Sequence, residues 1–394
     1  MLEAKYICSE CGKEFPITSE NMVCDLCSRE QLPNKPLKGI LDVKMVFPKA
    51  FSAKSIWDFL PIESAFLPEI PVGDTPLWQP SILNEETGFE RLFLKNDSLN
   101  PTGSLKDRAS YLVAGFARKF GLKDISVAST GNAGSSMAGI GASAGLSVTV
   151  FVPKKAPEAK LVQALQYGAR VIRVDGNYDR AFELSLEYSR ITGSLCRNTA
   201  FNPMTIEGKK TVAIECFFQL GRAPDVLFVP VGDGVILSGV YKGFEDLISC
   251  GIMNKMPMIY AIQAEGSDAI SRASESGDFD EFKPSTTVAD SICVDAPRAG
   301  LRALSYLIKH RGVCVRVSDE EILSAQHELA RKTGVFAEPA ASASFAGFLK
   351  IKDRLDKSET VVLLITGNGL KDIDSAQRIV EFGIEPITSI EEIV

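Results

Sequence analysis

Residues 91–132 read RLFLKNDSLNPTGSLKDRASYLVAGFARKFGLKDISVASTGN and contain one full repeat of the pattern that decides the fold. The apolar run at 91–95 predicts a buried strand, and residues 107–121 have the spacing of an amphipathic helix. A second apolar run at 125–130 predicts another strand. Strand, helix and strand in this order are typical of two parallel strands that share a sheet.

The same alternation of strand and helix patterns continues along the rest of the chain. Further strands are expected at 148–153, 170–176, 225–232, 258–266 and 360–367, and further helices at 135–145, 156–169 and 178–191. Such repetition predicts an α/β fold of parallel sheets with helices on both faces. Ligands of these folds bind in the loops at the carboxyl ends of the strands.

The first 35 residues differ from the rest of the chain. They contain two Cys-x-x-Cys pairs among turn-forming residues and end near Pro33 and Pro36; the pairs are Cys8 with Cys11, and Cys24 with Cys27. Two such pairs suit tetrahedral binding of one zinc ion by four thiolates, which leaves no open position for catalysis. We therefore expect a structural zinc-ribbon-like module, with a degenerate or redox-active set of cysteines as the alternative.

Composition limits the classes of function that the chain can have. With 394 residues, 45% apolar and 24% charged, it has the length of two domains and an ordinary globular composition. It has no apolar run of about 20 residues, which a membrane helix requires. Its net charge is -7 with no basic tract, which disfavours nucleic acid as a partner. The N-terminus shows no leader pattern, so a cytoplasmic protein is the expectation.

The inventory of reactive side chains is also informative. Only two histidines occur, His310 and His327, which nearly excludes histidine triads and histidine-rich metal centres. The five cysteines outside the N-terminal pairs stand singly in apolar surroundings, as reduced core thiols do.

Four polar, glycine-rich loops carry the candidate chemistry. They are Asn100 to Arg108, Ser129 to Asn132, Gly232 to Gly234 and Thr366 to Gly369. Each loop alone is explained as a turn or a helix cap. Their combination in this order at strand ends is more specific, because loops built on a rigid scaffold host function.

Each of the four loops offers a distinct group. Lys106 stands at a helix start near Arg108, where a neutral amine can form an imine; an exposed helix-start lysine is the alternative. The loop at Ser129 opens a helix and suits a substrate carboxylate. The loop at Gly232, followed by a helix expected near Gly239, suits a phosphate, although Asp233 would repel one unless its side chain points away. These glycine loops also leave a nucleotide-binding protein open as an alternative.

From Gly73 to Asp372, the residues in these loops resemble the threonine-synthase branch of the fold-type II pyridoxal-phosphate enzymes. The resemblance implies that Lys106 binds pyridoxal 5'-phosphate, that Asn132 contacts the cofactor's 3'-oxygen, and that Thr366 contacts the pyridine nitrogen. It places the substrate carboxylate at Ser129, Thr130 and Gly131. It assigns the cofactor phosphate to Gly232, Asp233, Gly234, Val235, Ile236 and Leu237. Glu338 is a further candidate nearby.

The resemblance also implies an architecture like that of the tryptophan synthase β chain, with two parallel-sheet, three-layer domains. The large cofactor-binding domain is expected at 36–115 and 205–394, and a smaller mobile domain at 116–204. The zinc-ribbon-like module occupies 1–35. Relatives of this fold are commonly dimers, so a homodimer is expected.

Two positions depart from the resemblance near the substrate. Ala133 stands where a threonine is usual, and Thr205 stands where an arginine is usual. Asn132 and Thr205 are also expected among the substrate-binding residues. Asn198, Thr199, Lys209 or Lys210 is expected to compensate for the missing arginine, although lysine lacks the fork of arginine.

The expected activity is a pyridoxal-phosphate-dependent elimination or replacement on an amino acid, in which Lys106 moves protons. Conversion of O-phospho-L-homoserine and water to L-threonine and phosphate is the first hypothesis. A serine/threonine or diaminopropionate ammonia-lyase and a β-replacement enzyme acting on O-phosphoserine or O-acetylserine are the alternatives. An inactive, cofactor-binding regulatory protein is the non-enzymatic alternative.

Overall fold

A computed structural model describes residues 2–49, 51–53, 55–279, 281, 283–380 and 386–392. Its largest sheet has six strands in the order β12-β11-β10-β13-β5-β4. Their bounds are Leu77–Trp78 for β4, Leu92–Asn96 for β5, Val226–Pro230 for β10, Met258–Ala264 for β11, Val313–Val317 for β12 and Val361–Ile365 for β13. All neighbours are parallel except β4, which runs antiparallel to β5 at the edge.

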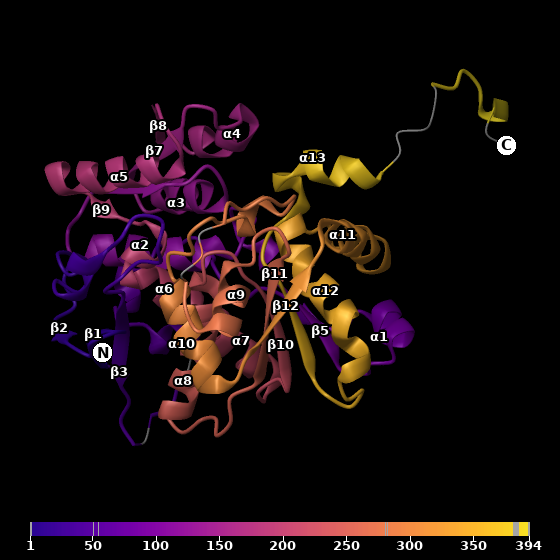
Figure 1. The fold of residues 1–394 in the computed structure, drawn as a ribbon, viewed down its shortest axis with the longest axis horizontal. Helices are drawn as coiled ribbons and strands as arrows, with labels where there is room; N and C mark the ends of the chain where they lie inside the picture. Colours follow the sequence, from indigo (N-terminus) through magenta and orange to yellow (C-terminus); the bar gives the residue numbers. More distant parts are fainter. Residues whose placement is uncertain are drawn as a thin grey trace.

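Helices cover both faces of this large sheet (Figure 1). One face packs on α7 (Thr211–Leu220), α8 (Val235–Ser249), α9 (Ala269–Ser276) and α10 (Gly300–His310), and the other on α1 (Ser81–Thr87), α11 (Asp319–Thr333) and α12 (Pro339–Ile351). Successive residues of β10 show the two faces, since Leu227 and Val229 pack with α7 and α8 whereas Phe228 packs with α12. The central strands β10 and β13 are apolar throughout because both of their faces are buried.

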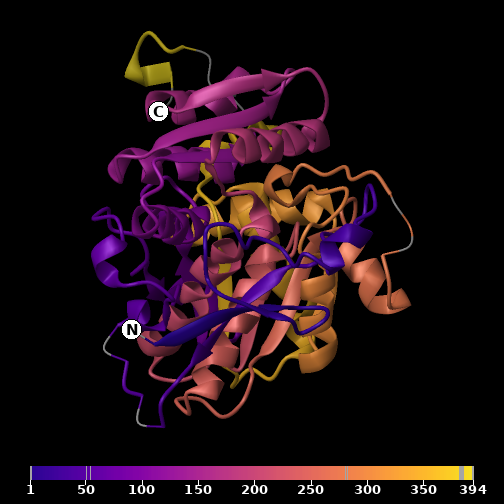
Figure 2. The ribbon, with the colours of Figure 1, turned by 90° about the vertical axis from the view of Figure 1, so that its left-hand side faces the viewer.

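A second sheet has four parallel strands in the order β8-β7-β6-β9. They are β6 (Asp124–Ala128), β7 (Ser147–Pro153), β8 (Arg170–Val174) and β9 (Leu195–Cys196), packed against α3 (Asn132–Ser143), α4 (Glu158–Gln166) and α5 (Tyr178–Thr192). Figures 1 and 2 show this small sheet above the large one. Helix α2 (Lys106–Lys119) connects the two parallel sheets, because it contacts α3 of the small sheet and also α6 (Pro203–Lys209), which packs against α8 of the large one.

The N-terminal segment that carries the cysteine pairs forms a third, antiparallel sheet in the order β2-β1-β3, and Cys8 is the last residue of β1. It is formed by β1 (Glu3–Cys8), β2 (Glu14–Phe15) and β3 (Leu41–Val46), and β3 contacts α6. The sequence predicted that this module ends at residue 35. The sheet extends to residue 46, because β3 pairs with β1 along its whole length.

The parallel sheets with helices on both faces are confirmed. The helix expected near Gly239 begins instead at Val235, because Gly234 adopts a left-handed conformation (φ of 87°) that starts the helix early. The short helix α13 (Ile373–Ala376) follows the last strand. Among the described residues, the structure contains no helix long and apolar enough to cross a membrane.

Candidate active site

A cavity of about 450 Å³ lies where the carboxyl ends of strands from the two parallel sheets face each other. Its wall is formed by residues at or after the ends of β6, β8, β9 and β10, by the first residue of α2, by the last residue of α6 and by the connection between α9 and α10. These are Lys106, Ala128, Ser129, Thr130, Gly131, Asn132, Ala133, Asn177, Tyr178, Asp179, Arg197, Thr199, Lys209, Val231, Gly232, Asp233, Gly234, Ile236, Leu237 and, from residues 285–298, Ser285, Asp290, Ser291, Ile292, Cys293, Val294, Asp295, Ala296 and Arg298. Its volume is in the range, roughly 300–1,000 Å³, of small-molecule sites.

Lys106 is the first residue of α2, and its side chain lines the cavity. The preceding loop is tied to β13, because the Leu105 amide donates to the Thr366 carbonyl at 2.8 Å. The Lys106 amine has no hydrogen bond or ion pair within the described part of the chain. Burial lowers its pKa below the usual range; Asp233 and Glu338 oppose this effect and Arg197 adds to it. The prediction that Arg108 helps to keep this amine neutral is wrong, because the Arg108 guanidinium is bonded to Asp97 and Glu215.

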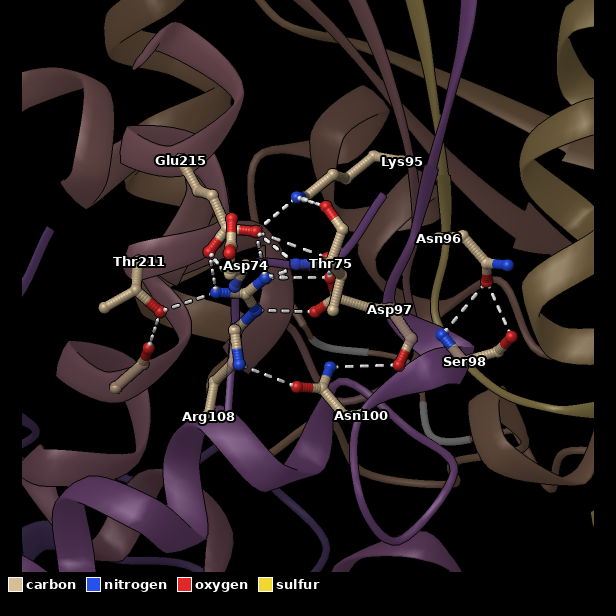
Figure 3. A network of polar contacts seen from close by, with 12 residues as sticks. Asp74, Thr75, Lys95, Asn96, Asp97, Ser98, Asn100, Arg108, Thr211 and Glu215 are labelled. Atoms are coloured by element: carbon tan, nitrogen blue, oxygen red, sulfur yellow. Dashed lines mark hydrogen bonds and ion pairs between the residues drawn. The ribbon is translucent and has the colours of Figure 1, made fainter. Parts of the chain in front are cut away.

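Arg108 lies in a buried polar network that fixes the start of α2 (Figure 3). Its guanidinium group donates two hydrogen bonds to Asp97, at 2.6 and 2.9 Å, and two to Glu215, both at 3.0 Å. Glu215 also accepts from Lys95 and from the Asp74 and Thr75 amides. The network therefore joins α2 to α7 and to the end of β5, which holds Lys106 at the cavity wall.

The loop at 129–133 follows β6 and leads into α3. Its Asn132 side chain donates to both carboxylate oxygens of Glu338, at 3.0 and 2.8 Å, and to Ser291 Oγ at 3.1 Å. Burial raises the pKa of Glu338, and the hydrogen bond from Asn132 opposes that rise. A second cavity of about 360 Å³, lined also by Glu338 and Lys371, shares Asn132 and Ser291 with the first. Asn132 and Ser291 therefore belong to the walls of both cavities.

The loop at 232–237 leads from β10 into the first turn of α8. The amides of Ile236 and Leu237 belong to that turn and have no carbonyl within the helix to bond, so they can receive an anion. Glycine is required at 232, because a Cβ there would lie 2.8 Å from Ile292 Cα. The Asp233 carboxylate does not point away from this region, since it accepts from the Thr199 hydroxyl and, at 3.1 Å, from the Val235 amide. Burial raises the pKa of Asp233, but Lys209 and Lys106 outweigh burial and lower it.

Thr366 and Glu338 reach the site from the ends of β13 and α12. Backbone hydrogen bonds link their loops, since the Glu338 amide donates to the Gly367 carbonyl at 3.0 Å. The structure brings Thr366 next to the Lys106 loop, but Thr366 and Val235 do not line the main cavity.

Two predicted substrate-binding residues, Asn198 and Thr205, also lie outside the cavity wall, and their polar atoms bond to the protein. The Asn198 side chain accepts from the Ala128 amide and donates to Ser185 Oγ, each at 2.7 Å. The Thr205 hydroxyl donates to the carbonyls of Thr199 and Asn202. Both side chains therefore shape the segment that follows β9 instead of facing a ligand.

The sequence reasoning missed Arg197 and the connection at 285–298. Arg197 follows β9 directly, so the rule that ligands bind at carboxyl ends of strands could have found it. The 285–298 connection carries no motif and reaches the cavity only through the tertiary fold.

The donor set of this cavity fits pyridoxal 5'-phosphate. Lys106 offers an amine whose pKa is lowered, and the first turn of α8 offers amides to a phosphate. Arg197 and Lys209 add positive charge, which offsets the carboxylate of Asp233. The arrangement can hold an aldehyde cofactor at the lysine and an anionic group at α8.

The four N-terminal cysteines converge as the sequence predicted. Their sulfur atoms all lie within 4.8 Å of one another, with Cys8 and Cys27 3.8 Å apart and Cys11 and Cys24 3.7 Å apart. Four sulfurs at about 2.3 Å from a zinc ion lie about 3.8 Å apart, whereas a disulfide would bring a pair to about 2 Å. The cluster can therefore bind a metal ion.

Comparisons with known proteins agree with this chemistry. Residues 69–367 match the family described as "Pyridoxal-phosphate dependent enzyme". The threonine synthase of Methanocaldococcus jannaschii is 34% identical over 396 residues, which cover 96% of this chain and 95% of that protein. The threonine synthase of Halalkalibacterium halodurans is 37% identical over 328 residues, covering 82% of this chain and 90% of that protein.

Solved structures show the same fold at lower identity. A processed form of threonine deaminase isoform 2 from Solanum lycopersicum has a TM-score of 0.69 at 18% identity, covering 92% of this chain and all of that chain. Maize serine racemase has a TM-score of 0.67 at 20% identity, covering 77% of this chain and 91% of that chain. The extent of these matches and the lysine-centred cavity lead to one conclusion: the chain belongs to the pyridoxal-phosphate-dependent enzyme family, in the branch that contains the threonine synthases.

Proposed function

We propose that the chain is a threonine synthase that converts O-phospho-L-homoserine and water to L-threonine and phosphate. The observation that carries this proposal is the Lys106 amine, which has a lowered pKa and faces two anion-receptive loops in one cavity. Relatives named threonine synthase, at 34 to 37% identity over most of the chain, support it further.

The proposed roles follow from the position of each group. Lys106 carries the cofactor, the 232–237 loop binds its phosphate, and Asn132 and Thr366 contact its ring. Ser129, Thr130 and Gly131 receive the substrate carboxylate, because they stand at the N-terminus of α3. Bound pyridoxal phosphate supplies an electron sink for the pair left when a proton leaves Cα.

Lys106 is also the proposed group that moves protons. Its lowered pKa keeps a fraction of the amine neutral, so that it can accept the Cα proton and return protons later. The protonated form is disfavoured in a buried cavity, where an ammonium is poorly solvated. Glu338 lies within electrostatic range of this amine and opposes its deprotonation.

The first prediction concerns Lys106. The purified protein is expected to show the visible absorption band of a lysine-bound cofactor, which borohydride removes, and to release phosphate from O-phospho-L-homoserine. Lys106→Ala is expected to lack the band and to lose at least about 1,000-fold in kcat, because it removes both the anchor and the base.

The matched control is Lys119→Ala, which lies at the other end of the same helix and outside the cavity. A screen of O-phosphoserine, O-acetylserine, serine, threonine and diaminopropionate tests the alternatives. Turnover confined to one of these compounds would replace the proposed substrate. A cofactor band with no turnover on any of them would favour the regulatory protein.

We propose that the cysteine cluster binds one structural zinc ion. The distances between its sulfur atoms suit a tetrahedral site, and four thiolates leave no position for substrate. Metal analysis of the purified protein tests this assignment, and a ratio far below one zinc per chain would contradict it.

We also propose that residues 116–204 form a smaller mobile domain and that the chain is a homodimer. All strands of the small sheet lie within this range, and Lys160–Asp290 and Arg298–Asp179 are ion pairs that join it to the 285–298 connection. Hydrogen exchange with and without substrate tests the mobility, and light scattering tests the dimer.

A further inference from the structure

Arg197 is a buried cation with an unused donor. It follows β9, is 1% exposed and lines the main cavity. Its Nη2 atom is buried and has no hydrogen-bond partner, while its Nε is 3.4 Å from Ser110 Oγ. A buried guanidinium donor without a partner is costly, so a ligand that accepts from it would be bound favourably.

Lys209 is a second such cation, at the end of α6. It is 2% exposed, lines the same cavity, and makes no hydrogen bond or ion pair within the described ranges. Its neighbour Lys210 is equally buried but is paired with Glu207 and, at 2.7 Å, with Asp246. The two adjacent lysines therefore have different surroundings: Lys210 is paired with carboxylates, whereas Lys209 faces the cavity.

The local charge balance leaves these cations partly uncompensated. Asp233 is the carboxylate that acts most strongly on both groups, and it is already bonded to Thr199 and to the Val235 amide. Burial lowers the pKa of Lys209 well below its usual range, with Lys106 acting in the same direction, and burial lowers the pKa of Arg197 to about 10. Two buried basic side chains that share the carboxylate of Asp233 favour a ligand that brings further negative charge.

Resting on the proposed function, we propose that Arg197 and Lys209 bind the phosphate group of the substrate. Arg197 supplies a planar fork suited to phosphate, and Lys209 supplies a point charge from the end of α6. The pair takes the place of a cation at Thr205, whose hydroxyl is consumed by the backbone. The chain is thereby selective for phosphorylated amino acids despite the threonine at that position.

The cofactor's own phosphate has a separate receptor. The backbone amides in the first turn of α8 point out of the helix N-terminus and can bind a phosphate without help from a side chain. If Arg197 and Lys209 served that phosphate instead, their loss would release the cofactor and leave the preference for phosphorylated substrates unchanged. The two assignments therefore make different predictions for the same variants.

The experiment compares Arg197→Gln, Lys209→Gln and the conservative Arg197→Lys in the cofactor-loaded protein. The surface variant Arg190→Gln on α5 is the control. We expect Arg197→Gln to reduce kcat/KM for O-phospho-L-homoserine about 100-fold, mainly through KM, and Lys209→Gln about 10-fold or more. Arg197→Lys is expected to recover part of the loss, and the cofactor absorption band is expected to remain.

Binding measurements give a readout that does not depend on turnover. Inorganic phosphate is expected to compete with substrate in the wild type, and at least tenfold more should be required in Arg197→Gln. Binding of L-threonine, which has no phosphate, should change less than about threefold, because the lost interaction is specific to the phosphate.

Each result decides the proposal. Loss of cofactor with an unchanged KM would assign the pair to the cofactor phosphate and overturn it, as would variants with wild-type affinity for inorganic phosphate. If the wild type does not turn over O-phospho-L-homoserine, the proposed function fails. The phosphate titration then still decides whether Arg197 and Lys209 form an anion site.

Discussion

Arg108 lies two residues after Lys106 and connects the start of α2 to two carboxylates. Both Asp97 and Glu215 receive a pair of hydrogen bonds from the one guanidinium group. Lysine at this position could keep the charge but not the fork. The position of Lys106 therefore depends on the shape of Arg108 as well as on its charge.

A second prediction follows for Arg108→Lys. We expect it to lower the free energy of unfolding by about 3 kcal/mol, because the buried carboxylates of Asp97 and Glu215 each lose the pair of hydrogen bonds from the guanidinium fork. It should also weaken cofactor binding, since the start of α2 is displaced. Urea unfolding and cofactor titration measure the two effects. Arg118→Lys on the same helix is the control, because Arg118 is exposed and donates to the Leu67 carbonyl; equal losses in the two variants would contradict this account.

At the level of single residues, sequence reasoning worked where a residue belongs to a local motif. Lys106, Asn132 and Asp233 stand in recognisable loops, and the structure brings all three to one cavity. Arg197 and Asn198 are neighbours in sequence, but the extended segment after β9 turns one side chain into the cavity and the other into the protein. The sequence pattern alone does not determine which of the two faces the ligand.

Among the elements, α7 is joined to the rest of the large domain through Glu215. This carboxyl group is 3% exposed and accepts from Arg108, Lys95 and the 74–75 amides. Burial raises its pKa, but Arg108 and Lys95 outweigh burial and lower the pKa to about 2. The ionised form is thus favoured in the folded protein.

The third prediction is a pH dependence with a defined sign. Because the folded-state pKa is lower than the usual 4.5, this carboxylate stabilises the fold above pH 4.5 and its contribution is lost as the pH falls toward 2. The stability gap between wild type and Glu215→Gln should narrow by roughly 1.4 kcal/mol per pH unit in that window. Urea midpoints measured at several pH values test it.

The control for this titration is Glu183→Gln, which removes an exposed carboxylate on α5 that pairs with Arg180 at 3.2 Å. An exposed ion pair contributes little to the free energy of unfolding, so the difference between wild type and Glu183→Gln should stay nearly constant with pH. If the difference in stability between wild type and Glu215→Gln also stayed constant with pH, the ionised Glu215 carboxylate would not stabilise the fold through its partners.

Helices and strands with strong periodicity were predictable, and those with weak or unusual patterns were not. The central strands β10 and β13 are fully buried apolar runs and were predicted. The edge strand β12 was missed, because only two of its five residues are buried and its pattern is weak. The start of α8 was placed too late, because the apolar residues after Gly234 do not by themselves mark a helix start.

In the whole molecule, the cysteine-bearing sheet and the cavity share a helix. The β3 strand of that sheet contacts α6, and the last residue of α6 is Lys209. The N-terminal sheet is therefore positioned to support the cavity wall as well as itself. Cysteine spacing predicted the cluster, but the contact with α6 is tertiary and leaves no local signal.

The fourth prediction concerns the metal. Removal of zinc by a chelator, or Cys24→Ser, is expected to lower the melting temperature and to raise KM for substrate, because α6 loses support from β3. The cofactor band should persist, since the Lys106 loop is held by β13. Cys250→Ser, outside the cluster, is the control; an unchanged melting temperature after complete metal loss would contradict a structural role.

The connection at 285–298 has a consequence for how the substrate range of this enzyme can change over evolution. It contributes nine residues to the cavity wall, yet its only regular structure is a single 3-10 turn at Asp290–Ile292. Substitutions there leave the strand ladders of both parallel sheets intact, so selection can explore new side-chain preferences at a low cost in folding. A library confined to this connection is therefore a natural starting point for changing which amino acid the enzyme accepts.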